Sequence, residues 1–486
     1  MVNLTTVLSA VAAAAVVIPS LLFLRISIWI HQKDVNELSE TRKIPNLSTL
    51  GRLKETWEMI VGGVPHKARA EEMRKIGLLK TLNDFQQKIQ RDIWWFHFSG
   101  PKNNKWFAKF VTSETVHQRW RPSDKSVVHA IEGESIGWGT GESYAQINGV
   151  IGAAFRGQKP YSAGYIKSHV AELATEVRKI EIGAKQRVFQ VNVNDLARRF
   201  FFDVTTDAFM AHKMKALSTD CSFFDYFDRL RQIPVVTPES KKLIDACNTQ
   251  IKDLISNRAT AIESGEFKVE TNPDILSLVA QALQDGNFSE RQATCTISNI
   301  FTAGTLNSAM HAQFVLLHLA YDQAIQDKVR KEVTTVMDGD FPNDEKPLEY
   351  TTWTVKESLR LYENGTFPLP RVAAHNITLE NGGVIPKGSF MGVSLLATHR
   401  DATYFPEPDV FKPERWDSNN LAPFSFIPFG VGSRACPAAN MGLVNVAVFV
   451  AFIVQNYKIT LPPNSAHRKG INFNYALRGN MCLEKI

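Results

Sequence analysis

Apolar residues recur at helical spacing through the middle of the chain, and this pattern predicts a mainly helical protein. The clearest helical segments are residues 165–182, 241–264 and 274–283. Short runs with a preference for β-structure occur at residues 106–111 and 388–395. We therefore expect a mainly α fold with a small β region, drawn from the N-terminal third and from residues 371–395.

The N-terminal segment has a different character from the rest of the chain. Residues 2–24 contain no charged side chain, and this run is long enough to cross a bilayer as a helix. Basic residues follow it, and positive charge favours the cytoplasmic side of a membrane. We expect a transmembrane anchor over residues 1–30 and one large cytosolic domain over residues 31–486. A cleaved signal peptide is the alternative, although the start lacks the usual basic region.

Composition narrows the class of protein only a little. The chain has 486 residues and a formal net charge of +6, a balance that does not suggest a nucleic-acid-binding protein. Its five cysteines are scattered and include no Cys-x-x-Cys pair, so neither a zinc site nor a disulfide framework is indicated. No linker, repeat or low-complexity tract divides the chain after its N-terminal segment.

One cysteine, Cys436, lies in a run of sequence Phe-Gly-Val-Gly-Ser-Arg-Ala-Cys-Pro that suits a haem-ligating loop. Glycines such as Gly432 allow a tight turn close to a flat ring. Pro437 fits the first turn of a following helix, which would place the sulfur where the helix dipole stabilises a thiolate. Arg434 offers a planar fork of donors to a propionate, and Phe429 can cover the sulfur. The alternative for a lone cysteine is an inert buried residue before a core helix.

The loop resembles the haem-binding signature of the cytochrome P450 family, Phe-x-x-Gly-x-Arg-x-Cys-x-Gly, with Ala438 in place of the last glycine. Two further motifs extend the resemblance over much of the chain. Glu357 and Arg360 match the family's Glu-x-x-Arg, and Arg415 lies in Pro-Glu-Arg-Trp, which is similar to its Pro-Glu-Arg-Phe. An exposed helix pair is the alternative for Glu357 and Arg360 taken alone.

This resemblance implies a cytochrome P450 fold that holds haem b, with Cys436 as the axial ligand of the iron. A thiolate in that position pushes electron density to the iron and favours O–O cleavage. Arg371 falls where the family usually has a second arginine for a haem propionate. Glu357, Arg360 and Arg415 would form a buried ion network, which is costly to bury unless every charge is paired.

The central helix departs from the family pattern. Where the family has Ala-Gly-x-(Asp or Glu)-Thr-(Thr or Ser), residues 303–308 read Ala-Gly-Thr-Leu-Asn-Ser. The small pair at its start would leave room for dioxygen and substrate. Leu306 replaces the acid that normally relays protons, and Asn307 replaces the alcohol. Asn307 could hold a water, and Thr305 and Ser308 could extend a water chain. The alternative is that Asn307 only satisfies a backbone carbonyl at a helix kink.

A second departure lies upstream, where residues 141–155 align with the family's Gly-x-x-Trp-x-x-x-Arg helix. Tyr144 replaces the tryptophan and Asn148 replaces the arginine. Both family residues usually contact a haem propionate, and Tyr144 could still do so through its hydroxyl. Arg371 and Arg434 would then carry most of the propionate binding.

The function that the resemblance implies is that of a haem-thiolate monooxygenase of the endoplasmic reticulum membrane. It would take electrons from NADPH through cytochrome P450 reductase and insert one oxygen atom of dioxygen into an apolar terpenoid, polyketide or alkaloid scaffold. The sequence style is similar to that of fungal enzymes of secondary metabolism. Leu306 and Asn307 also suit a haem-thiolate isomerase, dehydratase or ring-forming enzyme, and a silent haem-binding scaffold is a third possibility.

Overall fold

The computed structural model describes most of the chain after residue 125. The described residues are 126–157, 163–230, 236–269, 273–339, 341–342, 348–362, 371–378, 384–388, 390–393, 395–418, 420–462 and 480–486, together with the backbone of three earlier strands. The expected anchor at residues 1–30 and the β-prone run at residues 106–111 lie outside this set.

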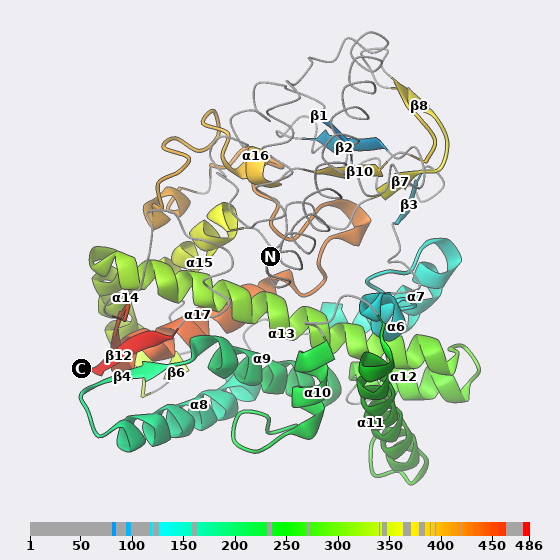
Figure 1. Cartoon of the computed structure of the whole chain (residues 1–486), viewed down its shortest axis with the longest axis horizontal. Helices are drawn as coiled ribbons and strands as arrows, with labels where there is room; N and C mark the ends of the chain where they lie inside the picture. Colours follow the sequence, from blue (N-terminus) through cyan, green and yellow to red (C-terminus); the bar gives the residue numbers. More distant parts are fainter. Residues whose placement is uncertain are drawn as a thin grey trace, which may run out of the picture.

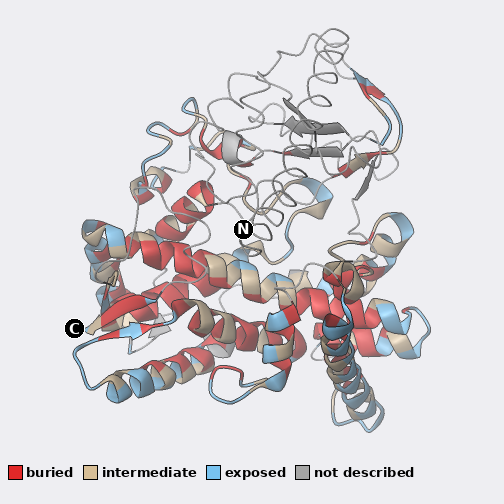
Figure 2. Cartoon of the chain, viewed as in Figure 1, coloured by how far each residue is buried: buried red, intermediate tan, exposed pale blue. Residues whose placement is uncertain are grey.

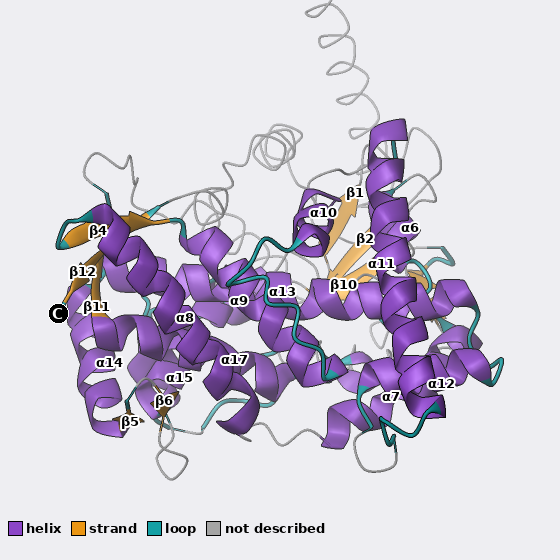
Figure 3. Cartoon of the chain, turned by 90° about the horizontal axis from the view of Figure 1, so that it is seen from below, coloured by secondary structure: helices purple, strands orange, loops and turns teal. Residues whose placement is uncertain are grey.

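Helices make up most of the described chain (Figure 3). They are α6 (Val127–Glu132), α7 (Gly141–Gly157), α8 (Ala163–Ala184), α9 (Val193–Met210), α10 (Ser222–Leu230), α11 (Pro238–Glu263), α12 (Ile275–Gln284), α13 (Glu290–Tyr321), α14 (Gln323–Val336), α15 (Glu349–Leu361), α16 (Leu395–His399) and α17 (Ala439–Asn456). Two 3-10 turns are η1 (Pro413–Trp416) and η2 (Gly432–Arg434). The three helical segments predicted from the hydrophobic pattern are confirmed as α8, α11 and α12.

The β-structure forms small sheets. The strands are β1 (Lys80–Asn83), β2 (Trp94–Phe98), β3 (His117–Arg119), β4 (Val188–Val191), β5 (Met337–Asp338), β6 (Phe341–Pro342), β7 (Arg371–Ala373), β8 (Ile377–Thr378), β9 (Val384–Ile385), β10 (Phe390–Val393), β11 (Tyr457–Thr460) and β12 (Met481–Lys485). The largest sheet has the order β1-β2-β10-β7-β3, so it joins strands of the N-terminal third to the 371–395 segment, the two regions in which we expected β-structure. Figure 1 shows this sheet on one side of α13 and helices α8 to α10 on the other.

The 32-residue helix α13 is the centre of the molecule. Ser289 and Gln292 form a reciprocal capping box at its start, which satisfies two backbone N–H groups. It packs against α9 and α17, and many residues of these three helices are buried (Figure 2). Among the described residues, α17 is the one helix long and apolar enough to cross a membrane, but most of it is buried in this core.

Candidate haem-thiolate site

The loop before α17 is shaped by two glycines. Gly430 and Gly432 have φ angles of +80° and +74°, a region that residues with a side chain rarely adopt. The backbone N–H of Cys436 donates to the carbonyl of Phe429 at 2.8 Å and closes the loop. Phe429 itself packs against the main hydrophobic core. The loop therefore presents Cys436 on a backbone that is fixed at both ends.

Cys436 is the exposed member of the chain's five cysteines, all of which lie in described segments; the others are buried or half-buried. Surrounding protein raises the pKa of the Cys436 thiol, and the N–H of Ala438 opposes that rise only in part. A thiol with a raised pKa stays protonated near neutral pH, and coordination to a metal ion removes the proton. The Cys436 sulfur is thus accessible enough to bind a metal ion, and binding would convert the thiol to a thiolate.

The helix that follows the loop starts later than predicted. We expected Pro437 in the first turn, but α17 begins at Ala439 with Ala438 as its N-cap. Pro437 therefore precedes the helix, and the N–H of Ala438, its N-cap residue, is the backbone group that lowers the pKa of the Cys436 thiol.

Arg434 and Tyr144 connect the start of α7 to the cysteine loop. The Arg434 guanidinium lies 3.3 Å from the centre of the Tyr144 ring and donates to the carbonyl of Gly139 at 2.7 Å. The Tyr144 hydroxyl donates to the carbonyl of Ser433 at 3.3 Å. The structure thus brings together two of the residues that sequence analysis assigned to propionate binding.

Arg371, the second arginine expected at a propionate, lies in the five-stranded sheet. It is the first residue of β7, where Met391 of β10 and Arg119 of β3 pair with it on either side. Only 6% of Arg371 is exposed. Arg371 already has an interaction within the protein, and its guanidinium has five N–H donors, so a cofactor carboxylate could be a further acceptor.

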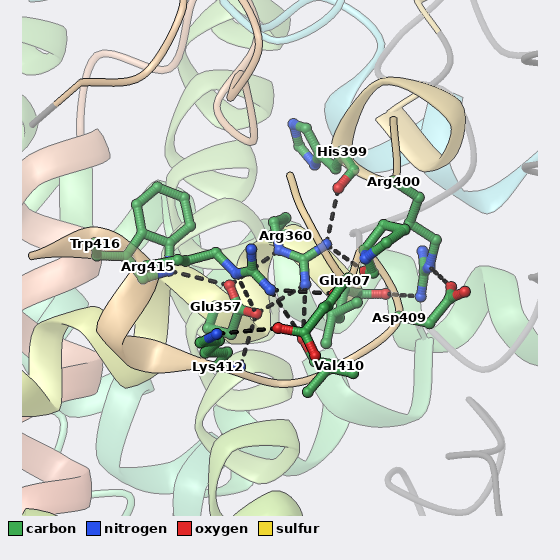
Figure 4. A network of polar contacts seen from close by, with 12 residues as sticks. Glu357, Arg360, His399, Arg400, Glu407, Asp409, Val410, Lys412, Arg415 and Trp416 are labelled. Carbon is green, nitrogen blue, oxygen red and sulfur yellow. Dashed lines mark hydrogen bonds and ion pairs between the residues drawn. The ribbon is translucent and has the colours of Figure 1, made fainter. Parts of the chain in front are cut away.

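Glu357 and Arg360 of α15 form a bidentate ion pair with no exposed side-chain surface (Figure 4). Arg415 and Trp416 of η1 donate to the same carboxylate at 2.9 and 3.0 Å. The backbone N–H of Lys412 adds a further donor at 2.9 Å. Both oxygens of the buried carboxylate therefore accept several hydrogen bonds. This satisfaction offsets the free-energy cost of burying the charges.

This network is linked to the cysteine loop through His399, a residue that sequence analysis did not single out. Arg360 donates to the carbonyl of His399 at 2.9 Å, and the His399 ring accepts the backbone N–H of Ile427 at 3.0 Å. Burial, with Arg360 and Arg400 nearby, lowers the pKa of His399 to about 3. The ring therefore stays neutral and can accept this bond at the start of the loop that carries Cys436.

On α13, the residues predicted to lie near dioxygen divide between two faces. Ala303 and Asn307 are exposed in the middle of a largely buried helix, and Ser308 is half-buried. The Asn307 amide nitrogen donates to the Ala303 carbonyl at 3.2 Å, and the helix continues without interruption. Thr305 is buried, on the side of the helix away from Ala303. The structure therefore does not bring Thr305 together with Asn307.

Gly304 has a packing role that differs from the one expected. A Cβ atom at Gly304 would lie 2.5 Å from the side chain of Thr205 on α9, closer than real contacts allow. The absence of a side chain lets α9 and α13 approach closely. Of the small pair, it is Ala303 that leaves open space on the exposed face.

We expect Gly304→Ala to destabilise the fold by about 1–3 kcal/mol, because the added methyl group overpacks the α9–α13 contact. Chemical denaturation of the haem-loaded protein measures this. Gly149→Ala on α7 is the control, since a Cβ there meets nothing within 4 Å and should be neutral or slightly stabilising. When it is combined with Gly304→Ala, Thr205→Ala should restore part of the lost stability, because it removes the atoms that the new methyl group meets. A Gly304→Ala protein of unchanged stability would contradict the packing role.

Another group that sequence analysis missed surrounds Glu132, at the end of α6. Its buried carboxylate accepts bonds from Asn299 and Trp138, at 2.8 and 3.2 Å, and from the Thr302 hydroxyl. Asn299 and Thr302 belong to α13, 167 and 170 positions along the chain from Glu132. No local pattern signals a contact of that range.

Comparison with known proteins agrees with this architecture. The cytochrome P450 family profile matches residues 164–477. Beta-amyrin 11-oxidase of Glycyrrhiza uralensis is 23% identical over 309 residues, 60% of this chain and 58% of the relative. A ferruginol synthase of Salvia fruticosa is 30% identical over 274 residues, 53% of this chain and 54% of the relative. The matches thus span little more than half the length of these relatives.

A crystal structure of a cytochrome P450 (CYP102L1) superimposes with a TM-score of 0.65 and covers 87% of this chain and 98% of its own, at 18% identity. The cysteine loop, the buried network behind it and these matches define a haem-thiolate class of protein. The chain belongs to the cytochrome P450 family.

Proteins of this family and fold bind haem b, and the residues present fit that group. Cys436 offers an accessible thiol on a rigid loop, whereas the remaining cysteines are at least partly enclosed. Arg371 and Arg434 offer two guanidinium groups for the two propionates. The exposed positions Ala303 and Asn307 leave part of α13 uncovered by protein.

Proposed function

We propose that this protein is a monooxygenase that inserts one oxygen atom of dioxygen into an apolar small molecule. The observation that carries the proposal is the exposed Cys436 thiol on a loop held by the Glu357–Arg360–His399 contacts. Bound haem would supply one-electron and dioxygen chemistry. The electrons would come from NADPH through cytochrome P450 reductase.

The chain's own residues have distinct roles in this proposal. Cys436 would hold the iron, while Arg434 and Arg371 would orient the haem through its propionates. Asn307 would hold a water with its amide oxygen, because its amide nitrogen is engaged by the Ala303 carbonyl. Thr305 has no part in the proposal, since it is buried away from the exposed face. Ser308, half-buried beside Asn307, could hold a second water.

A terpenoid, polyketide or alkaloid scaffold in a secondary metabolic pathway is the substrate class that we propose. The name of one relative, Beta-amyrin 11-oxidase, supports an oxidative role. A screen for substrate-induced spectral shifts with such scaffolds would identify candidates for turnover assays.

Reconstitution with purified reductase tests the function. The proposal predicts NADPH oxidation and a product that contains one oxygen atom from labelled dioxygen. Turnover of an organic peroxide without reductase or NADPH, and no dioxygen-dependent product, would instead identify an isomerase or dehydratase. Leu306 and Asn307 would then be the signature of that chemistry. A haem-loaded protein inactive in both assays would favour a binding role.

We also propose that residues 1–30 anchor the protein in the endoplasmic reticulum membrane, with the catalytic domain in the cytosol. Removal of residues 1–30 should shift the protein from the membrane fraction partly or wholly to the soluble fraction. The spectrum of the reduced carbon monoxide complex should not change. Sedimentation of the membranes from lysed cells measures the shift between the two fractions. Loss of the haem spectrum on truncation would show that this segment supports the fold.

A further inference from the structure

The uncovered part of α13 carries no titratable side chain. Between Cys295 and His311 the helix has no acid, base or thiol, and Leu306 lies between the exposed residues Ala303 and Asn307. Insertion of one oxygen atom with release of water consumes two electrons and two protons for each dioxygen. On the proposed function, the side chains of this stretch cannot be the source of these protons, which must come from water or from an acid elsewhere in the protein.

Glu132 is the carboxylate that the structure attaches to this helix. It lies at the end of α6, which packs against α13 (Figure 1). Thr302 donates its hydroxyl to Glu132 and is half-buried next to the exposed Ala303. Thr302 also precedes Leu306 by one helical turn, so their side chains are neighbours on the same face. The Glu132–Thr302 pair thus adjoins the uncovered part of α13.

We propose that Glu132, acting through the Thr302 hydroxyl, is the proton donor to the dioxygen-binding side of this site; the proposal rests on the proposed monooxygenase function. A hydroxyl both accepts and donates hydrogen bonds, so Thr302 can receive a proton from a protonated Glu132 while it passes its own to an adjacent water. Thr302 ends unchanged and Glu132 becomes a carboxylate. Because Glu132 is buried, it regains a proton from water by the reverse transfer through the Thr302 hydroxyl before the next dioxygen is reduced.

Three side-chain donors hold Glu132 in place. The Asn299 amide and the Trp138 indole donate to one carboxylate oxygen, which holds the side chain in place after the proton has left. The other oxygen faces Thr302 and is the one that would exchange the proton. Gly137 allows this arrangement, because a Cβ there would lie 2.8 Å from the Asn299 amide.

Glu132→Gln is the test variant, since it keeps the shape of the side chain and removes its proton. Thr302→Val removes the hydroxyl and leaves Glu132 with its Asn299 and Trp138 contacts. Glu134→Gln is the matched control, because Glu134 belongs to the same segment but forms an exposed ion pair with Arg291. All three are prepared as haem-loaded full-length proteins.

Two probes avoid the need for a known substrate. The first is carbon monoxide, whose stretching frequency in the reduced complex responds to hydrogen-bond donors near the bound gas. The second is dioxygen reduction with NADPH and reductase. Superoxide forms from one electron and no proton, whereas hydrogen peroxide and water need protons. A lost proton donor should therefore raise the ratio of superoxide to peroxide plus water.

We expect Glu132→Gln and Thr302→Val to shift the carbon monoxide frequency and to raise the superoxide ratio at least about tenfold, the low end of the effect of a positioned acid. Glu134→Gln should leave both unchanged. The proposal would be overturned if Glu132→Gln had the carbon monoxide frequency and superoxide ratio of the wild type. It would also be overturned if Glu134→Gln changed both readouts as much as Glu132→Gln does. If Glu132→Gln does not fold, Thr302→Val decides by the same criteria. A wild type that oxidises no NADPH refutes the proposed function, and the carbon monoxide shift still decides whether Glu132 acts at this site.

Discussion

Arg360→Ala is expected to yield little folded, haem-loaded protein. Removal of the guanidinium leaves the buried Glu357 carboxylate without its bidentate partner, at a cost of about 3–5 kcal/mol. It also releases the carbonyl of His399, whose ring holds the start of the cysteine loop. Haem content per protein and the denaturation midpoint measure the two effects.

Lys179→Ala is a matched control for Arg360→Ala. Lys179 pairs with Glu176 on α8 at the same spacing of three residues, but its side chain is 62% exposed. An exposed pair of this kind contributes about 0.3–0.5 kcal/mol, so haem content should not change. A stable, haem-replete Arg360→Ala protein would mean that the buried network does not support the haem site.

Asn307→Ala should divert reducing equivalents to hydrogen peroxide and lower the yield of product per NADPH. Loss of the proposed water on the Asn307 amide would leave the proton source intact, so peroxide could still form, but protons would no longer be directed to split the O–O bond; positioned proton delivery is worth about 10²–10⁴-fold in rate. Substrate affinity should change little. Asn307→Thr should retain much of the coupling, because a hydroxyl can hold the same water. If Asn307→Ala formed as much product per NADPH as the wild type, Asn307 would have only a structural role, through its hydrogen bond to the Ala303 carbonyl.

The parts of the site that follow short-range rules could be predicted from sequence. Glu357 and Arg360 are three residues apart on one helix, and the glycines around Cys436 set a local turn. Arg415 was placed with them by a recurring motif. The helical periodicity of α8, α11 and α12 was readable for the same local reason, since each buries one face.

The remaining features depend on contacts between distant segments. His399 acts on a backbone group 28 positions away, and Glu132 meets Asn299 across 167 positions. The sequence around Gly304 suggested open space at a reaction site, but the contact with Thr205 of α9 explains this glycine. Periodicity shows which face of a helix is buried and does not show which helix covers it.

Cys436 is assigned as the thiolate ligand of a haem, and the absorption spectrum of the reduced carbon monoxide complex tests this assignment. The wild type should show the red-shifted band that thiolate ligation produces. Cys436→Ala should abolish that band and all activity, and Cys436→Ser should keep some haem without it. Cys221→Ser, which changes a half-buried cysteine elsewhere, should match the wild type. A Cys436→Ala protein that kept the band would contradict the central assignment.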